Sequence, residues 1–142
     1  MPPTAKKILL IEDEAFIADI YAHELTKAGF SVRVARDGTS GLQILESEPF
    51  DMLLLDIMLP GMHGLEILRQ WRTKSPNSTM PVILLTNLGQ DEVIKEAFAL
   101  GARGYLIKAS YTPKQVVSEV TNVLGSNAAS AIPPANEEAR NG

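Results

Sequence analysis

Residues 52–64 read Met-Leu-Leu-Leu-Asp-Ile-Met-Leu-Pro-Gly-Met-His-Gly, and this stretch decides the fold. Its first four residues form a continuous apolar run, which is typical of a strand covered on both faces, as in a parallel sheet. Asp56 closes the run, and Pro60 and Gly61 mark a loop beyond it. The stretch therefore predicts a buried strand that brings a carboxylate to one edge of a sheet.

Four more strands are predicted on either side of this stretch. Residues 8–11, 82–85 and 105–107 are short apolar runs, whereas residues 31–35 alternate between polar and apolar side chains. A half-polar strand is best placed at an edge. The spatial order 2-1-3-4-5 does this, and it creates a switch point beside the first strand, where such sheets bind ligands at the carboxyl ends of their strands.

Helices are predicted between these strands, because apolar residues recur there at helical spacing. Gly29, Gly101 and Gly125 can end three of them. Thr112 is expected to cap the last helix, with Pro113 in its first turn. Strand and helix thus alternate five times, which predicts a doubly wound α/β domain with five helices on the two faces of a five-stranded parallel sheet.

The chain has 142 residues, a formal net charge of −4 and no cysteine. This charge gives no overall attraction to nucleic acid or anionic membranes, and the lack of thiols excludes disulfides and thiolate metal sites. The apolar runs are too short for a signal peptide or a membrane span, so we expect a cytoplasmic protein. We expect residues 1–125 to form one domain and residues 126–142, rich in serine, alanine, asparagine and proline, to form a disordered tail.

Polar side chains follow four of the predicted strands. Glu12 and Asp13 follow the first, Asp56 the third, Thr86 the fourth and Lys108 the fifth. Clustered carboxylates repel one another without a cation, and Mg²⁺ is commonly held by carboxylates and substrate phosphate oxygens. Asp56 can then attack phosphorus, while Lys108 and the Thr86 hydroxyl contact the phosphoryl oxygens.

Each feature has a simpler interpretation when taken alone. An acidic run after Ile11 is more often a charge cluster at a helix N-terminus, and an aspartate after a strand is commonly a turn former. Their shared position at strand ends, rather than their identities, favours a phosphoryl-transfer site.

Four segments together resemble the receiver domain of bacterial two-component response regulators, in particular the single-domain type related to chemotaxis regulators. They are residues 11–14, 54–64, 84–86 and 101–108, which stand in the same order at the ends of successive strands. The resemblance implies a flavodoxin-like fold and a phosphorylation-dependent switch.

The resemblance also implies roles for individual residues. Asp56 would be the phosphoacceptor and a Mg²⁺ ligand. Asp13 would hold Mg²⁺ directly, Glu12 would help through water, and the backbone carbonyl of Met58 would complete the protein ligands. Thr86 would bind the phosphoryl group and swing inward.

The implied partner on the donor side is a sensor histidine kinase or a phosphotransfer protein. On the output side it is a downstream protein or a second copy of the chain, met by the fourth helix, fifth strand and fifth helix. The chain would catalyse only its own phosphorylation and slow dephosphorylation, without direct contact to nucleic acid. Tyr105 would follow the movement of Thr86, and the candidate contacts on the output face are Val93, Ile94, Phe98, Arg103 and Tyr105.

Three residues depart from the family pattern. Ala109 replaces the usual proline after Lys108, so we expect a trans bond there and a differently shaped loop. Asn87 stands where a small residue is commoner, which puts the dephosphorylation rate in doubt. His63 replaces a frequent aspartate before the third helix, and we expect a weaker helix cap.

The main alternative is an adaptor that keeps the receiver fold but works without phosphorylation. An aspartyl phosphatase would need a second acid two residues after Asp56, where Met58 stands. A flavin site would need a hydroxyl-rich phosphate loop after the first strand, where the acidic residues would repel phosphate. The sequence leaves open whether the chain is a natural single-domain regulator or a fragment of a longer one.

Overall fold

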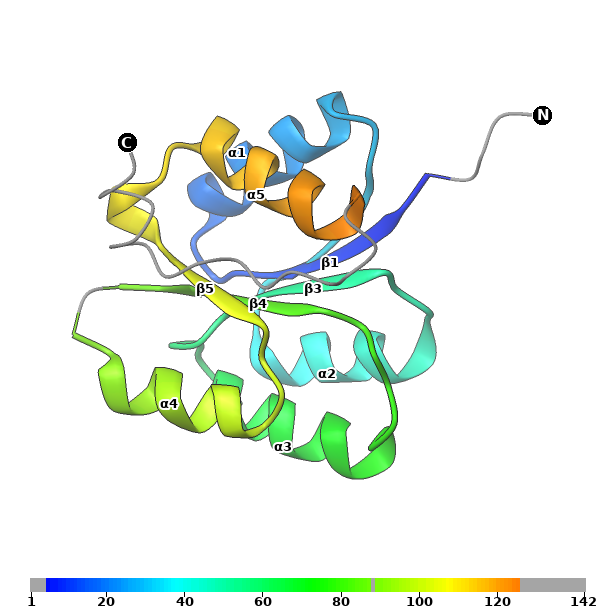
Figure 1. Cartoon of the computed structure of the whole chain (residues 1–142), viewed down its shortest axis with the longest axis vertical. Coiled ribbons are helices and arrows are strands. Elements are labelled where there is room, and N and C mark those ends of the chain that lie inside the picture. Colours follow the sequence, from blue (N-terminus) through cyan, green and yellow to red (C-terminus); the bar gives the residue numbers. More distant parts are fainter. Residues whose placement is uncertain (1–4, 88, 126–142) are drawn as a thin grey trace.

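The computed structural model describes residues 5–87 and 89–125. Five parallel strands form one sheet in the order β2-β1-β3-β4-β5, as predicted (Figure 1). The strands are β1 (Lys7–Ile11), β2 (Ser31–Ala35), β3 (Met52–Asp56), β4 (Val82–Thr86) and β5 (Gly104–Ile107). The half-polar strand β2 does lie at an edge, with the side chains of Ser31 and Arg33 exposed.

Five α-helices cover the two faces of the sheet, which confirms the doubly wound, flavodoxin-like arrangement. Helices α1 (Ala15–Lys27) and α5 (Pro113–Gly125) lie on one face. Helices α2 (Gly38–Ser47), α3 (Gly64–Lys74) and α4 (Asp91–Ala99) lie on the other (Figure 1). Every helix among residues 5–87 and 89–125 is too short or too polar to span a bilayer.

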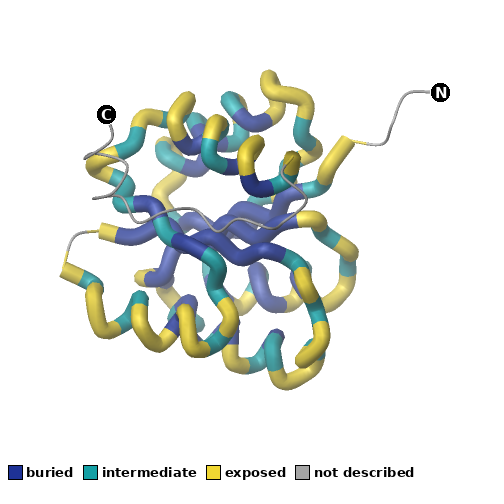
Figure 2. Tube along the Cα trace, viewed as in Figure 1, coloured by how far each residue is buried: buried dark blue, intermediate teal, exposed yellow. Residues whose placement is uncertain are grey.

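The sheet is the most buried part of the molecule (Figure 2). Successive strand residues point to opposite faces, so Leu53 and Leu55 join the cluster under α2 and α3, whereas Leu54 joins the cluster under α1 and α5. Burying one such leucine stabilises the fold by about 1.5–3 kcal/mol. The central strands are therefore a rigid platform for the side chains at their carboxyl ends.

The predicted helix ends are also present. Gly29 and Gly101 have φ angles of 102° and 99°, the left-handed conformation that glycine adopts without strain at helix ends. At the start of α5, the Gln115 N–H donates to Thr112 Oγ1 at 3.2 Å and the Thr112 N–H donates to Gln115 Oε1 at 2.8 Å. These reciprocal bonds form a capping box.

The loop after β5 begins at Lys108, where a trans bond was expected. The Lys108–Ala109 bond is trans, and a short 3₁₀ turn, η1 (Lys108–Ser110), leads from β5 toward α5. The expected tail, residues 126–142, lies outside the described residues.

Candidate functional site

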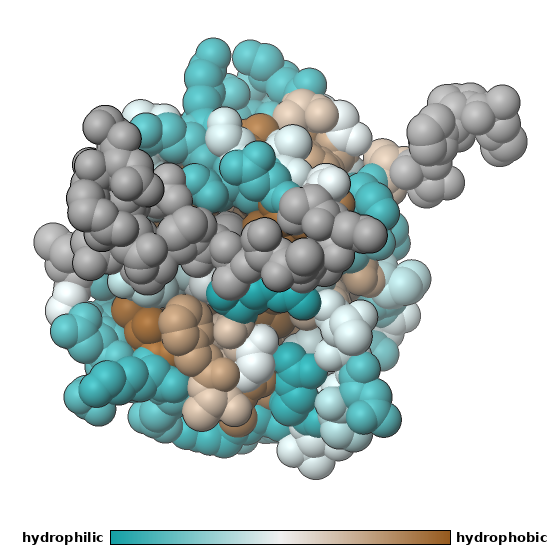
Figure 3. Space-filling view, viewed as in Figure 1, coloured by the Kyte–Doolittle hydropathy of each residue, from teal (hydrophilic) through white to brown (hydrophobic). Residues whose placement is uncertain are grey.

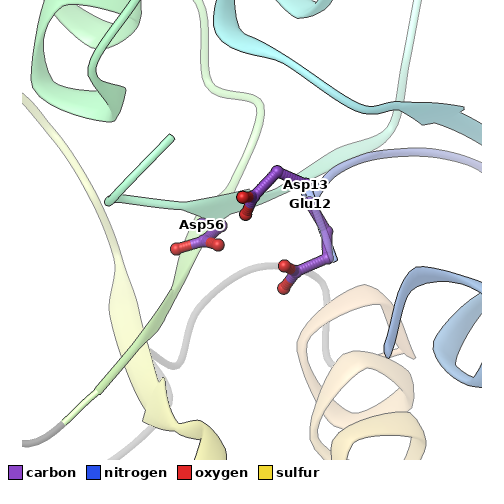
Figure 4. Close-up of side chains that lie close together, drawn as sticks. All are labelled: Glu12, Asp13 and Asp56. Atoms are coloured by element: carbon purple, nitrogen blue, oxygen red, sulfur yellow. The ribbon is translucent and has the colours of Figure 1, made fainter. Parts of the chain in front are cut away.

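Three carboxylates meet where β1 and β3 end. Glu12 and Asp13 follow β1, and Asp56 is the last residue of β3. Each contributes an oxygen to a group in which all three atoms lie within 4.8 Å of one another (Figure 4). Glu12 and Asp56 are buried, at 0% and 3% exposure, and Asp13 is half-buried. The structure thus brings together the acidic residues that the sequence singled out.

Lys108 reaches this cluster from the end of β5. Its Nζ lies 2.8 Å from Glu12 Oε1 and 3.0 Å from Asp56 Oδ2, and its side chain is only 8% exposed. The more distant Glu14 carboxylate, 4.0 Å away, is exposed to solvent. One ammonium group is therefore shared between two buried carboxylates, and the contact with Glu12 was not anticipated from the sequence.

Charge in this cluster is not balanced by Lys108 alone. Burial, followed by the negative charge of Glu12, raises the pKa of Asp56 to about 7, although the hydrogen bond from Lys108 opposes the rise. Burial by itself lowers the pKa of Lys108, but its close contacts with the Glu12 and Asp56 carboxylates and their negative charges together outweigh this effect and raise the pKa. The site therefore carries surplus negative charge in a poorly solvated position, which favours a cation.

The donor atoms fit a hard divalent cation. Carboxylate oxygens are typical ligands of Mg²⁺, which also retains several waters and takes phosphate oxygens. The exposed Met58 lies next to the cluster, because its N–H donates to Asp56 Oδ1 at 3.1 Å. This bond holds one oxygen of Asp56 while Lys108 holds the other. The residues present can therefore bind a metal ion beside a fixed carboxylate.

Thr86 lies at the end of β4, as predicted, and is 1% exposed. Its hydroxyl donates to the Asn87 carbonyl oxygen at 3.1 Å. In the β4–β5 register Leu84 faces Tyr105 and Thr86 faces Ile107, so Thr86 and Tyr105 share one face of the sheet as diagonal neighbours. This placement is compatible with the coupled movement that the resemblance implies.

The aromatic ring of Tyr105 continues this line toward α4. Its centroid lies 6.1 Å from that of Phe98, and the two planes are tilted by 52°. Tyr105 is half-buried and Phe98 is 42% exposed. A chain of neighbouring groups therefore leads from the end of β4 to the surface of α4.

Two residues near the site were missed from the sequence. Burial raises the pKa of Tyr21 on α1, and the charges of Lys108, Glu12 and Asp56 act on its hydroxyl. In the sequence, Tyr21 is marked only by its apolar spacing with Ile17 and Leu25, which indicates a buried helix face and not a site. Arg36 contacts the Asp13 carbonyl from the loop after β2, and no sequence pattern indicates such a loop contact.

His63 caps α3 in spite of its departure from the family pattern. Its Nδ1 accepts a hydrogen bond from the Leu65 N–H at 3.2 Å, so the imidazole supplies the side-chain acceptor that caps the helix. Asn87 is exposed beside Thr86. Neither residue belongs to the carboxylate cluster.

Comparison with known proteins identifies relatives over most of the chain. The family model of the response regulator receiver domain matches residues 8–121. The transcriptional regulatory protein QseB of Escherichia coli O157:H7 is 44% identical over 102 residues, which are 72% of this chain and 46% of that protein. The transcriptional regulatory protein CusR of Escherichia coli K12 is 36% identical over 126 residues, or 89% of this chain and 54% of that protein. The chain thus spans about half the length of these curated relatives.

Solved structures show the same architecture. Chemotaxis response regulator CheY4 of Vibrio cholerae gives a TM-score of 0.77 at 30% identity, covering 84% of this chain and 99% of that chain. A CheY-like receiver domain protein from Methanospirillum hungatei gives a TM-score of 0.79 at 27% identity, covering 95% of this chain and 99% of that chain.

Proposed function

Because this chain belongs to the response regulator receiver domain family, we propose that it works as a phosphorylation switch with Asp56 as its phosphoacceptor. The observation that carries this assignment is the position of the Asp56 carboxylate. It lies at the carboxyl end of a buried strand, between the Lys108 ammonium and the carboxylates of Glu12 and Asp13. Phosphorylation-dependent switching is the standard function of receiver domains in two-component systems.

We assign the metal site to Glu12, Asp13 and Asp56, with the Met58 carbonyl as a further ligand, and Mg²⁺ as the ion. When bound, Mg²⁺ would neutralise charge on the acids and on the incoming phosphoryl group. Without a metal, burial raises the pKa of Asp56 to about 7. A cation beside the carboxylate would lower this pKa and keep Asp56 ionised, as attack on phosphorus requires.

In the proposed reaction a carboxylate oxygen of Asp56 forms a bond to phosphorus as the bond between phosphorus and the donor's leaving group breaks. The product is an acyl phosphate, and the leaving group keeps the electron pair of the broken bond. Lys108 is already within 3.0 Å of Asp56 and can move its hydrogen bond to a phosphoryl oxygen. Slow attack by water on the acyl phosphate would restore the free carboxylate.

The signal would leave the site through Thr86 and Tyr105. The Thr86 hydroxyl would exchange the Asn87 carbonyl for a phosphoryl oxygen, and the Tyr105 ring would fill the space that Thr86 leaves. Receiver domains interact with histidine kinases or phosphotransfer proteins, and we place the phosphodonor of this chain in that class. A cytoplasmic location and the division at residue 125 stay predictions.

The output surface is assigned to α4, β5 and α5. Apolar side chains gather between α4 and β5 (Figure 3), where Phe98 is 42% exposed beside Tyr105. A downstream protein or a second copy of the chain would cover this surface. Several relatives are named transcriptional regulators, but this chain covers only about half of the length of each. A transcriptional output of the whole protein therefore stays a proposal.

The direct test is phosphorylation by acetyl phosphate. We expect the intact mass to increase by one phosphoryl group in the presence of Mg²⁺, and to stay unchanged with EDTA or in Asp56→Asn. A receiver can accept the phosphoryl group from a protein donor only. If acetyl phosphate adds no mass, the protein is therefore titrated with beryllofluoride and Mg²⁺. If beryllofluoride leaves the amide resonances of Thr86 and Tyr105 unshifted as well, the phosphorylation-independent adaptor becomes the better assignment.

A further inference from the structure

The segment that joins β2 to α2, residues 36–38, ends with the first residue of α2 and contacts both loops that carry the proposed metal ligands. Arg36 approaches the loop after β1, with Nε and Nη2 each 3.4 Å from the Asp13 carbonyl oxygen. Gly38 approaches the loop after β3, where its N–H donates to the Pro60 carbonyl oxygen at 3.3 Å. One short turn therefore links two loops that lie far apart in the sequence.

The contact of Gly38 is made by backbone atoms in close approach. Gly38 is buried, and a Cβ placed on it would overlap the carbonyl oxygen of Met62. The turn itself is fixed to α2, because the Asp37 side chain accepts the Ser40 N–H at 2.8 Å and the Ser40 hydroxyl at 3.0 Å. The loop after β3 thus rests against a rigid helix start.

Arg36 holds the loop after β1 at its central residue. Before it, the Glu12 N–H donates to the Ala35 carbonyl at 3.0 Å, which continues the β1–β2 ladder. After it, the Glu14 N–H donates to Glu12 Oε2 at 3.1 Å. The guanidinium binds the carbonyl between these two bonds, so it restrains the backbone that orients the Asp13 carboxylate.

We propose that residues 36–38 are a positioning clamp that sets the Mg²⁺ affinity of the Glu12, Asp13 and Asp56 site. The inference rests on the proposed metal site. Arg36 is a positioning residue here, since it reaches the ligands through the Asp13 backbone and not through their carboxylates. Groups that hydrogen-bond to metal-ligating residues and orient them affect metal affinity even though they do not contact the ion.

The positive charge of Arg36 and its hydrogen bonds to Asp13 have opposite effects on Mg²⁺ affinity, so one variant can distinguish them. A cationic guanidinium near the acidic cluster repels Mg²⁺, so removing the charge alone would tighten metal binding. Loss of the clamp would weaken binding because the Asp13 loop gains freedom. The sign of the change in Arg36→Ala therefore separates positioning from electrostatics.

The experiment measures the Mg²⁺ dissociation constant of the full chain by isothermal titration calorimetry, for the wild type, Arg36→Ala, Arg36→Lys and Arg33→Ala. Arg33 is a matched control, because it is an exposed cation that pairs with Glu48 at 3.3 Å. We expect the dissociation constant to increase about three- to tenfold in Arg36→Ala, partial rescue in Arg36→Lys, and little change in Arg33→Ala. The metal-free Tm of Arg36→Ala should stay near that of the wild type.

Equal or tighter Mg²⁺ binding by Arg36→Ala would overturn the clamp. A loss of affinity matched by the same loss in Arg33→Ala would also overturn it, since the effect would then not depend on the contact between Arg36 and the Asp13 carbonyl. If the wild type itself binds no Mg²⁺, the proposed metal site fails first and the clamp with it.

A second pair of variants tests the backbone contact. Gly38→Ala would displace the loop after β3, because the added methyl group meets backbone atoms of Met62. In the control Gly41→Ala, on the same helix, the methyl group meets the side chain of Ile11 instead. We expect both to lower the metal-free Tm but only Gly38→Ala to weaken Mg²⁺ binding. Equal dissociation constants in the two variants would contradict the clamp.

Discussion

Lys108 donates a hydrogen bond to Asp56 Oδ2 at 3.0 Å, although 52 positions separate the two residues in the chain. The same ammonium lies 2.8 Å from Glu12 Oε1, so it joins the ends of β1, β3 and β5. Buried carboxylates without a counter-charge are costly, and Lys108 offsets part of that cost in the metal-free protein. Its place beside Asp56, the proposed phosphoacceptor, therefore has consequences for stability as well as for chemistry.

Replacing Lys108 by methionine should destabilise the metal-free protein by about 3 kcal/mol, because Glu12 and Asp56 would lose their shared partner. Mg²⁺ should restore a large part of this loss, since the ion supplies the missing positive charge. Urea unfolding with EDTA and with Mg²⁺ measures both effects. The control is Lys74→Met, which removes an exposed pair with Glu46 and should cost less than about 0.5 kcal/mol.

Asp56→Asn should be more stable than the wild type at neutral pH in the absence of metal. Burial and the charge of Glu12 raise the pKa of Asp56 from 3.8 to about 7, so folding disfavours its ionised form. The wild type therefore loses stability relative to the variant as the pH rises from about 4 to about 7, and the difference is constant above that range.

The expected gain of Asp56→Asn at pH 8 is about 1–4 kcal/mol, measured as the free energy of unfolding in EDTA. Added Mg²⁺ should stabilise the wild type and not the variant, so the difference in their free energies of unfolding should shrink or change sign. A pH-independent difference between them would show that the charge of Asp56 is not the cause.

The convergence of these groups could be predicted from the sequence because strand ends are predictable. Apolar runs predicted the strands, and the half-polar β2 favoured, without fixing, the order 2-1-3-4-5. In that order Glu12, Asp56 and Lys108 meet at one edge, as the structure confirms. How Lys108 divides between Glu12 and Asp56 could not be predicted. It depends on a side-chain rotamer and on the 3₁₀ turn that follows β5.

Loop contacts were the least predictable part of the site. The approach of Arg36 to the Asp13 carbonyl depends on the path of two loops, which periodicity does not encode. The closeness of Tyr21 to Lys108 could not be predicted either, since it follows from how α1 packs on the sheet and the sequence shows only an apolar helix position. That the Nδ1 atom of His63 accepts the capping bond could not be predicted, because the rotamer and tautomer of a histidine are not visible in a sequence.

Asp37→Ala should lower the Tm at pH 7 by roughly a few degrees, because α2 would lose the side chain that accepts the Ser40 N–H. The hydrogen bonds from the Ser40 backbone and hydroxyl lower the pKa of Asp37. Its stabilising effect is therefore present above its ordinary pKa of 3.8 and is lost as the pH falls through the lowered value.

Asp37→Asn is the matched variant for this prediction, since it keeps an acceptor for the Ser40 N–H and cannot titrate. Thermal unfolding between pH 2 and pH 7 should show a difference between wild type and Asp37→Asn that shrinks in acid. A difference that stays the same at every pH would mean that the charge of Asp37 contributes nothing.

Thr86→Val should separate phosphorylation from its output. Valine keeps the shape of threonine at this buried position but cannot donate to the Asn87 carbonyl or to a phosphoryl oxygen. Asp56, Lys108 and the acidic residues are untouched, so acetyl phosphate should still add one phosphoryl group, at a rate reduced by roughly tenfold. The conformational response to phosphorylation should stay confined to the surroundings of Asp56, because Thr86 would no longer move toward the phosphoryl group and Tyr105 would not follow it.

The measurement is the shift of the Tyr105 and Phe98 ring resonances on adding beryllofluoride and Mg²⁺. We expect these resonances to shift in the wild type and to stay in place in Thr86→Val, even though the amide resonances around Asp56 respond in both. Thr86→Ser, which restores the hydroxyl, should restore the ring shifts. Ring shifts of wild-type size in Thr86→Val would mean that the signal reaches α4 by a route that does not need the Thr86 hydroxyl.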